Sequence, residues 1–429
     1  MVSVNKYQNW KSTPTIDEHS RVKHKVYKEY ISAYIKTLMS NAKIPSIEFS
    51  IIDGFCGGGI YQETSGLGTC YGSPIIVMQA VQESRAAINV DRHTSPRNVK
   101  VNYFFTDNQS QAIKSLKNVI EIYGKDNPFF LVDKPNIHIK QTAFEQNLDK
   151  LILEINTKTK SQGKAIFLLD QYGYGKANVN SLVKILSKVK KSEIILTFNI
   201  ESMYPYFSGN DAFRKALINL GIDGEVNWKD YERIKEVNNN KEIRAFIQSQ
   251  ISEAIKRKTG AKYMTLFFIK PQTNKEWGYW LIHLTNNYRA HDVMKTIHWN
   301  NATYFGHELS PGIFEFGYES GKDGYAYGST LSFDFVFDFG QQSEKSCIEA
   351  IHEDFGHLVF KQDKIDVEKL FTNTVTFTPA SEKQLHSAVR LLHEQKDIQV
   401  LKQDGKERQP SKKYHRTDII VPSKQLRLI

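Results

Sequence analysis

The chain has 429 residues, 40% of them hydrophobic and 24% charged, a balance typical of globular proteins large enough for two or three domains. No run of about 18 apolar residues occurs, and the N-terminus has no apolar signal segment, so neither a transmembrane helix nor secretion is expected. Three cysteines without CxxC spacing exclude a disulfide framework, and we expect a reduced, cytoplasmic setting.

The first part of the chain predicts alternating helices and strands. A capping-box spacing of Thr15 and Glu18 opens an amphipathic helix, and the stretch SIEFSIID (46–53) predicts a buried strand. GSPIIVMQA then predicts a helix with Ser73 as N-cap and Pro74 at its first position. Further strands are expected at 101–109, 136–144, 164–173 and 192–200, with helices between them. This alternation indicates a parallel sheet that is covered on both faces.

The pattern changes after this sheet. Residues 203–260 are expected to form a helical insertion, and 261–271 with 277–287 two strands of an antiparallel hairpin. A parallel α/β sheet closed by such a hairpin is typical of class I S-adenosylmethionine (SAM)-dependent methyltransferases. We therefore expect a methyltransferase-like α/β domain over 1–305 and a connector over 306–342.

Residues 343–429 predict a winged helix-turn-helix. The expected order is a helix at 343–355, a short strand at 357–362, helices at 366–374 and 380–395, and two strands around the turn Gln-Asp-Gly within 396–414. Helix, strand, helix, helix and hairpin is the order of elements in that fold.

Acidic residues follow three of the expected strands. IIDGFCGGGI places Asp53 before Gly54, Gly57, Gly58 and Gly59, which predicts a cofactor loop or, alternatively, a plain structural turn. Asp107 ends the next strand and is expected to bind ribose hydroxyls, or to cap the helix that follows. Thr142, Ala143 and Phe144 are weaker candidates to flank an adenine. The loop is not a Walker P-loop, because no GK[ST] follows.

LLDQYGYG supplies the candidate catalytic residues. Asp170 ends the fourth strand and is expected to accept a hydrogen from the acceptor nitrogen, while Tyr172 would stack on a base. The alternative is that Asp170 caps the next helix and the tyrosines pack. No cysteine follows a proline, which argues against a cytosine-C5 methyltransferase. No metal is expected, because His291 and His298 lack an acid beside both and are predicted to be packing residues.

The segments IIDGFCGGG, GSPIIVMQA, FFTDN, FLLDQYGYG, YWLIHLTNNYRAHDVMKTIHW and the C-terminal TPASEKQLHSAVRLLHEQKDIQVLKQDGK together resemble the three-Cys-motif partner (TcmP) family. The family's Asp-x-Phe-x-Gly-x-Gly pattern is matched by Asp53, Phe55, Gly57 and Gly59. Its Asp-Pro-Tyr/Phe-Gly box is matched by Asp170, Tyr172 and Gly173, with Gln171 in place of the proline. The resemblance implies SAM as cofactor and a radical-SAM-like three-cysteine-motif protein as partner.

The net charge of +10 is unevenly distributed, since residues 381–429 hold eleven Lys/Arg and six Asp/Glu. We expect nucleic-acid contacts from the third helix and the wing of the winged helix, with an ordinary solvated face or a protein-docking face as alternatives. The helix candidates include Gln384 and Ser387 beside two cations. The cationic candidates are Lys383, Arg390, Lys406, Arg408, Lys412 and Lys413, with Lys402 and Arg416 in the same stretch.

The expected function is SAM-dependent methylation of a nucleic-acid base or nucleotide amine, assisted by a partner protein. A noncatalytic adaptor that brings the three-cysteine-motif partner to nucleic acid is the alternative, and Gln171 favours it. In the family's box, the proline at this position stiffens the base-binding turn.

Overall fold

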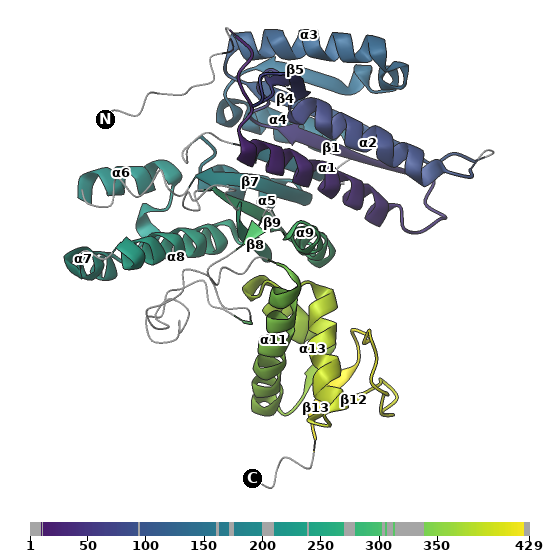
Figure 1. Cartoon of the computed structure of the whole chain (residues 1–429), viewed down its shortest axis with the longest axis vertical. Coiled ribbons are helices and arrows are strands. Elements are labelled where there is room, and N and C mark those ends of the chain that lie inside the picture. Colours follow the sequence, from purple (N-terminus) through teal and green to yellow (C-terminus); the bar gives the residue numbers. More distant parts are fainter. Residues whose placement is uncertain are drawn as a thin grey trace.

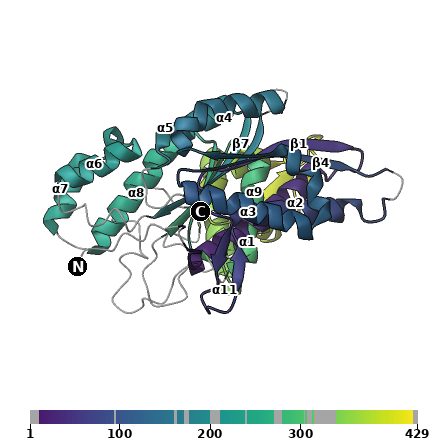
Figure 2. The same ribbon diagram turned by 90° about the horizontal axis from the view of Figure 1, so that it is seen from above.

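The computed structural model describes residues 10, 12–92, 95–159, 163–170, 176–199, 210–237, 240–269, 279–302, 305–306, 312–313 and 339–423. Its largest part is a twisted sheet between two layers of helices (Figures 1 and 2). One layer contains α1 (Glu18–Leu38), α2 (Ser73–Asn89), α3 (Ser110–Asp126) and α9 (Tyr288–Asn300). The opposite layer contains α4 (Phe144–Lys158), α5 (Val179–Lys188) and the insertion helices α6 (Asn210–Leu220), α7 (Trp228–Val237) and α8 (Asn240–Thr259).

Eight strands form the sheet in the order β10-β8-β9-β7-β6-β1-β4-β5. The strands are β1 (Ser46–Asp53), β4 (Asn98–Asp107), β5 (Ile137–Gln141), β6 (Lys164–Asp170), β7 (Lys191–Asn199), β8 (Tyr263–Ile269), β9 (Tyr279–Thr285) and β10 (Phe305–Gly306). Neighbours from β5 to β7 are parallel, whereas β9 runs antiparallel to both β7 and β8. The predicted hairpin therefore closes the parallel sheet, as in the class I methyltransferase fold.

Because β1 pairs with β4 on one side and β6 on the other, the chain changes direction across the sheet at β1. The carboxyl ends of adjacent parallel strands at such a point form the usual ligand-binding crevice of α/β proteins. A short hairpin of β2 (Ile60–Gln62) and β3 (Thr69–Tyr71) follows the glycine loop.

Helix α1 is fastened to the sheet by a buried polar group. Tyr30 donates a hydrogen bond to Glu193 of β7, and its hydroxyl lies 3.1 Å from Nε2 of His283 in β9. The predicted capping box is wrong: α1 begins at Glu18 with Asp17 as N-cap, and Thr15 forms a β-bridge with Gln62 instead. Thr15 does not cap the helix because its backbone is engaged with the β2–β3 hairpin.

The winged helix has its own three-stranded sheet in the order β11-β13-β12. Its elements are α11 (Gln341–Gln362), β11 (Ile365–Asp366), α12 (Val367–Thr374), α13 (Glu382–Glu394), β12 (Ile398–Leu401) and β13 (Ile419–Pro422). In Figure 1 this unit lies at the opposite end of the molecule from α3. In the part of the chain that the structure describes, no helix combines the length and apolarity needed to cross a bilayer.

Two details of the winged-helix prediction are wrong. Residues 357–362 continue α11, where Val359 packs into the core, and the first strand begins only at Ile365. The partner of β12 over its full length is β13 rather than the residues directly after Gly405, although Glu407 forms a single bridge with Leu401. A helix and a short apolar strand cannot be separated by local composition alone.

Candidate functional site at the carboxyl edge of the sheet

Asp53 lies at the end of β1 and is buried. Its carboxylate accepts hydrogen bonds from the backbone N–H of Phe55 at 3.2 Å and from the hydroxyl of Ser73 at 2.6 Å. Burial raises the pKa of Asp53 to about 7, although both hydrogen bonds act in the opposite direction. Ser73 is the first residue of α2 and Gly72 is its N-cap, so the predicted capping role of Ser73 is wrong. Ser73 holds Asp53 instead.

Asp107 ends β4, next to β1. One carboxylate oxygen accepts from the N–H of Gly57 at 3.1 Å and the other from the N–H of Gln109 at 2.8 Å. Burial raises the pKa of Asp107, and these hydrogen bonds only partly offset it. Gln109 is the N-cap of α3, so Asp107 does not occupy the N-cap position that the alternative required. A carboxylate has about four lone-pair sites, which leaves Asp107 acceptor capacity for a diol.

The residues after β5, the third strand end at this edge, contact Asp107 through the backbone. The N–H of Thr142 donates to the carbonyl of Asp107 at 3.0 Å, and Ala143 is the N-cap of α4. Both residues are half-buried beside Asp107. Phe144 is fully buried and packs under the glycine loop, where its ring centroid lies 5.9 Å from that of Phe55. The structure thus brings Thr142 and Ala143 close to Asp107, while Phe144 belongs to the core.

Close contacts within the chain explain why the loop is rich in glycine. A Cβ atom added at Gly58 would lie 2.3 Å from the ring of Trp10, and one at Gly54 would lie 2.8 Å from Phe144. Gly57 and Gly59 have φ of +59° and +77°, which other residues rarely adopt. Trp10 is buried against the loop, so the loop is packed by the chain's own N-terminal segment.

This N-terminal segment is held by the β2–β3 hairpin. The N–H of Ile16 donates to the carbonyl of Gln62 at 3.0 Å, and the N–H of Gln62 donates to the carbonyl of Pro14 at 2.8 Å. Arg21 forms an ion pair with Glu63. Sequence reasoning missed Trp10 as a loop contact, because it stands outside any periodic element.

Asp170 ends β6 and is paired with a lysine from α1. The ammonium of Lys23 lies 2.6 Å from both carboxylate oxygens, and Lys23 is 3% exposed. Burial raises the pKa of Asp170, but Lys23, with smaller contributions from His19 and His24, outweighs it, so the pKa is lowered overall. The N-cap of α5 is Asn178, so Asp170 does not cap that helix. Gln171, Tyr172 and Gly173 lie outside the described residues.

Lys23 was not a predicted site residue, but the sequence holds a signal for it. It lies four residues before Tyr27 on the helix face that carries Tyr27, Tyr30 and Tyr34, all of which are buried. A lysine in an apolar stripe needs a buried partner. The acid at the end of β6 is that partner.

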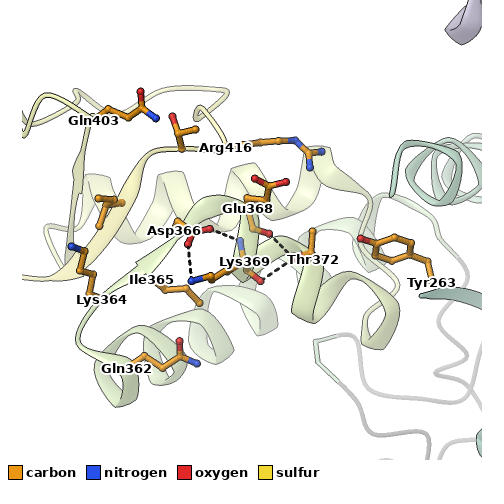
Figure 3. A pocket seen from close by; sticks show the side chains of 12 residues that line it. Tyr263, Gln362, Lys364, Ile365, Asp366, Glu368, Lys369, Thr372, Gln403 and Arg416 are labelled. Carbon is orange, nitrogen blue, oxygen red and sulfur yellow. Dashed lines mark hydrogen bonds and ion pairs between the residues drawn. The ribbon is translucent and has the colours of Figure 1, made fainter. Parts of the chain in front are cut away.

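A cavity of about 1060 Å³ lies elsewhere, between β8 and the winged helix (Figure 3). Tyr263 lines it on one side, and Lys364, Glu368, Lys369 and Arg416 are among the residues on the other. None of the three strand-end acids lines it, so this cavity is distinct from the carboxyl edge of the sheet.

The predicted nucleic-acid residues fall into two groups. Lys406, Lys412 and Lys413 are exposed on the loop after β12. Three others are ion-paired: Lys383 with Glu344, Arg390 with Glu394 and Arg408 with the buried Asp418. Gln384 cannot read a groove, because it is 2% exposed and completes a capping box with Ser381.

The histidines of α9 are packed as the sequence suggested. His291 Nδ1 lies 3.0 Å from the hydroxyl of Thr265, and His298 Nδ1 lies 2.7 Å from the carbonyl of Met294. Both side chains are fully buried.

The fold defines a class: a class I methyltransferase-type sheet followed by a winged helix. The family model of the GMT-like wHTH domain matches residues 324–405. The match covers the C-terminal part of the chain and confirms the predicted winged helix there, while membership of the TcmP family stays a prediction. No curated protein sequence matches this chain significantly.

Two solved structures are similar in outline. A protein from Legionella pneumophila shares 9% identity and a TM-score of 0.36, over 66% of this chain and 92% of its own. A structure described as a putative rRNA methylase from Clostridium thermocellum shares 13% identity and a TM-score of 0.26, over 63% of this chain and 98% of its own. Similarity this low carries no argument about activity, and the fold class is based on the strand order and the winged-helix match.

Proposed function

We propose that this protein is a SAM-dependent methyltransferase that acts on a base or nucleotide amine of nucleic acid. The observation that supports this most is the arrangement of Asp53 and Asp107 at the ends of adjacent parallel strands, joined through the glycine loop by the hydrogen bond from Gly57 to Asp107. Acids at this edge of an α/β sheet are typical of nucleotide sites.

The residues at this edge of the sheet fit SAM. Asp107 has acceptor capacity left for the two ribose hydroxyls, and Thr142 and Ala143 lie where they would flank the adenine. Asp53, Gly54, Phe55, Gly57 and Gly59 would hold the methionine end. SAM, when bound, supplies the methyl group. Asp170 would orient the acceptor amine once Lys23 releases one of its oxygens, and Tyr172 would stack on the base.

Specific observations also favour the second candidate, a noncatalytic adaptor. Lys23 engages both oxygens of Asp170, and Trp10 covers Gly57 and Gly58. An acid neutralised in this way is a poor acceptor for a substrate proton. In this case the protein would bring a three-cysteine-motif partner to nucleic acid through its winged helix.

Titration calorimetry with SAM tests the cofactor site. We expect the intact chain to bind and Asp107→Ala to weaken binding by about 10- to 100-fold, the loss that follows from removing a charged hydrogen-bond acceptor. Asp149→Ala, at an exposed acid on α4, is the matched control and should bind as the intact chain does. Absence of binding by the intact chain would contradict the methyltransferase proposal.

Transfer of labelled methyl groups from SAM to DNA, RNA and nucleotides then separates the two candidates. Transfer that is lost in Asp170→Asn supports the enzyme. SAM binding without transfer to any of these acceptors, with or without a partner protein, supports the adaptor.

A further inference from the structure

We propose that the wing, residues 398–413, is the surface through which this protein contacts nucleic acid, that the recognition helix α13 does not make these contacts, and that the partner is duplex DNA. This inference rests on the nucleic-acid role proposed above and specifies its surface and its partner.

The N-terminal end of α13 is occupied by the first domain. The backbone N–H of Glu382 donates to Asp292 of α9 at 2.7 Å, and the indole N–H of Trp299 donates to the carbonyl of Pro379 at 3.1 Å. Lys295 of α9 donates to the carbonyls of Val375 and Thr378 in the turn before α13. In helix-turn-helix proteins the N-terminal residues of the recognition helix contact base edges. Here the first of these residues, Glu382, is bonded to α9, and Lys383 is paired with Glu344 of α11.

The cations of α13 are also balanced by acids. Lys383 lies 2.9 Å from Glu344, and Arg390 lies 3.5 Å from Glu394. Glu382, at the start of the helix, is paired with Arg416 at 3.0 Å. A phosphate approaching this helix would have to displace these carboxylates, so the helix offers little net attraction to DNA.

The wing has the opposite character. Lys402, Lys406, Lys412 and Lys413 are all exposed. Among the described residues, one ion pair involves these ammonium groups, the contact of 3.9 Å between Lys406 and Asp404. Phosphate contacts made by such lysines release counterions and contribute most of the affinity of nonspecific DNA binding.

The wing is also fixed in shape before binding. The N–H of Lys402 donates to the carbonyl of Lys406 at 2.8 Å, and the N–H of Arg408 donates to the carbonyl of Val400 at 2.7 Å, around Gly405 with φ of +79°. Arg408 is held at 2.6 Å by Asp418, which is 2% exposed. Lys402 and Lys406 therefore project from a short hydrogen-bonded hairpin, and Lys412 and Lys413 follow it on the loop. A hairpin that is formed before binding lowers the entropy lost on binding.

A short hairpin of this kind fits B-form DNA better than duplex RNA. The major groove of B-form DNA admits a two-stranded β-ribbon, whereas the major groove of A-form RNA is too deep and narrow for side chains to read. The lysines would contact phosphates on either side of the groove and read no base edges, so binding should depend weakly on sequence.

Fluorescence anisotropy of the full-length chain with a mixed-sequence DNA duplex, over a salt series, tests the proposal. The wing variant K402Q/K406Q/K412Q/K413Q should bind at least about tenfold more weakly, and its salt slope should fall by about 0.9 for each phosphate that the variant no longer neutralises. The matched control K114Q/K117Q/K125Q/K150Q removes four exposed lysines from α3 and α4, far from the wing (Figure 1).

This control and the helix variant K383Q/S387A/R390Q should bind within about twofold of the intact chain. Thermal unfolding checks that every variant is folded.

Several outcomes would overturn the proposal. Loss of binding in the helix variant with binding retained in the wing variant would assign the DNA-binding surface to α13, and equal losses in the wing variant and the lysine control would show only a general charge effect. Tighter binding to an RNA duplex would overturn the choice of DNA. Absence of binding to any duplex would remove the nucleic-acid role itself, whereas failure of SAM binding or methyl transfer leaves the wing measurement unaffected.

Discussion

Asp53 and Asp170 end adjacent strands of one sheet, yet their pKa values shift in opposite directions. Asp53 is hydrogen-bonded to a neutral hydroxyl and a backbone N–H, and burial dominates. Asp170 is buried too, but an ammonium group at 2.6 Å stabilises its charged form. The identity of the partner, rather than burial alone, decides the charge state of each acid.

Replacing Asp53 with asparagine should make stability less dependent on pH. The pKa of Asp53 is about 7 in the folded chain and about 4 when unfolded, so between these values the folded state holds a proton that the unfolded state releases. The carboxyl therefore lowers the free energy of unfolding as pH rises from 4 to 7, by about 4 kcal/mol at most. Urea unfolding across this range should show that the free energy of unfolding of Asp53→Asn increases relative to that of the intact chain as pH rises. A constant difference would contradict this, and Asp126→Asn, at an exposed acid, is the control.

Removing the ammonium of Lys23 should have the reverse sign. The lowered pKa of Asp170 means that the pair stabilises the folded chain above about pH 4 and that this contribution is lost as pH falls through the folded-state pKa. Lys23→Met leaves a carboxylate without its partner and should lower the free energy of unfolding at pH 7 by about 3 kcal/mol. The loss should shrink in acid. Lys36→Met, at an exposed position on the same helix, should change little, and an equal loss at pH 3 and pH 7 would refute the assignment.

At the scale of elements, the glycine loop and the N-terminal segment form one packed unit. Trp10 lies on Gly57 and Gly58, and its ring centroid is 5.4 Å from that of Tyr61. The two interpretations of the loop, cofactor cradle and structural turn, are therefore not exclusive. The glycines satisfy packing within the chain, whereas the role of the acids beside them is tested by SAM binding.

Gly58→Ala should destabilise the protein by about 1–3 kcal/mol, because the new methyl group would lie 2.3 Å from the ring of Trp10. In a Trp10→Ala background the same change should cost much less, since the clashing ring is gone. A double-mutant cycle measured by thermal unfolding gives this coupling. Additive effects would show that Trp10 does not pack on the loop in solution. Gly224→Ala is the control, because an added Cβ there meets no atom within 4 Å.

The elements of the sheet were predictable because their signals are local. Alternation of apolar strands with amphipathic helices predicted the parallel sheet, and the antiparallel hairpin of β8 and β9 was also expected. Errors arose at boundaries. Thr15, Ser73 and residues 357–362 each had a plausible local role, but contacts with distant residues decided otherwise.

At the scale of the whole molecule, the two domains meet through α9 and the turn before α13. Lys295 is fully buried there and donates to the carbonyls of Val375 and Thr378. Burial lowers the pKa of Lys295 to about 7. Asp292, His291 and Cys347 are among the groups that face this interface from α9 and α11.

This lysine should make stability rise with pH. Between about pH 7 and pH 10 the unfolded chain holds a proton on Lys295 that the folded chain has released, so the free energy of unfolding increases across that window. Lys295→Met removes this increase and also removes the donor to the carbonyls of Val375 and Thr378, of which only Val375 has His291 Nε2 nearby, at 3.3 Å, at a cost of about 1–3 kcal/mol. The gap between the intact chain and Lys295→Met should therefore widen from pH 7 to pH 10. A gap that stays constant would contradict the assignment, and Lys345→Met, at an exposed position on α11, is the control.

The class of fold, the acids at the strand ends and the basic charge of the wing were all predictable from the amino-acid sequence, because each follows from the order and period of neighbouring residues. How these parts are used depends on the three-dimensional fold. It paired Lys23 with Asp170, 147 positions away, placed Trp10 on the glycine loop and docked the start of α13 against α9. Such contacts join residues that are far apart in the chain, and local patterns carry no information about which distant residues will meet.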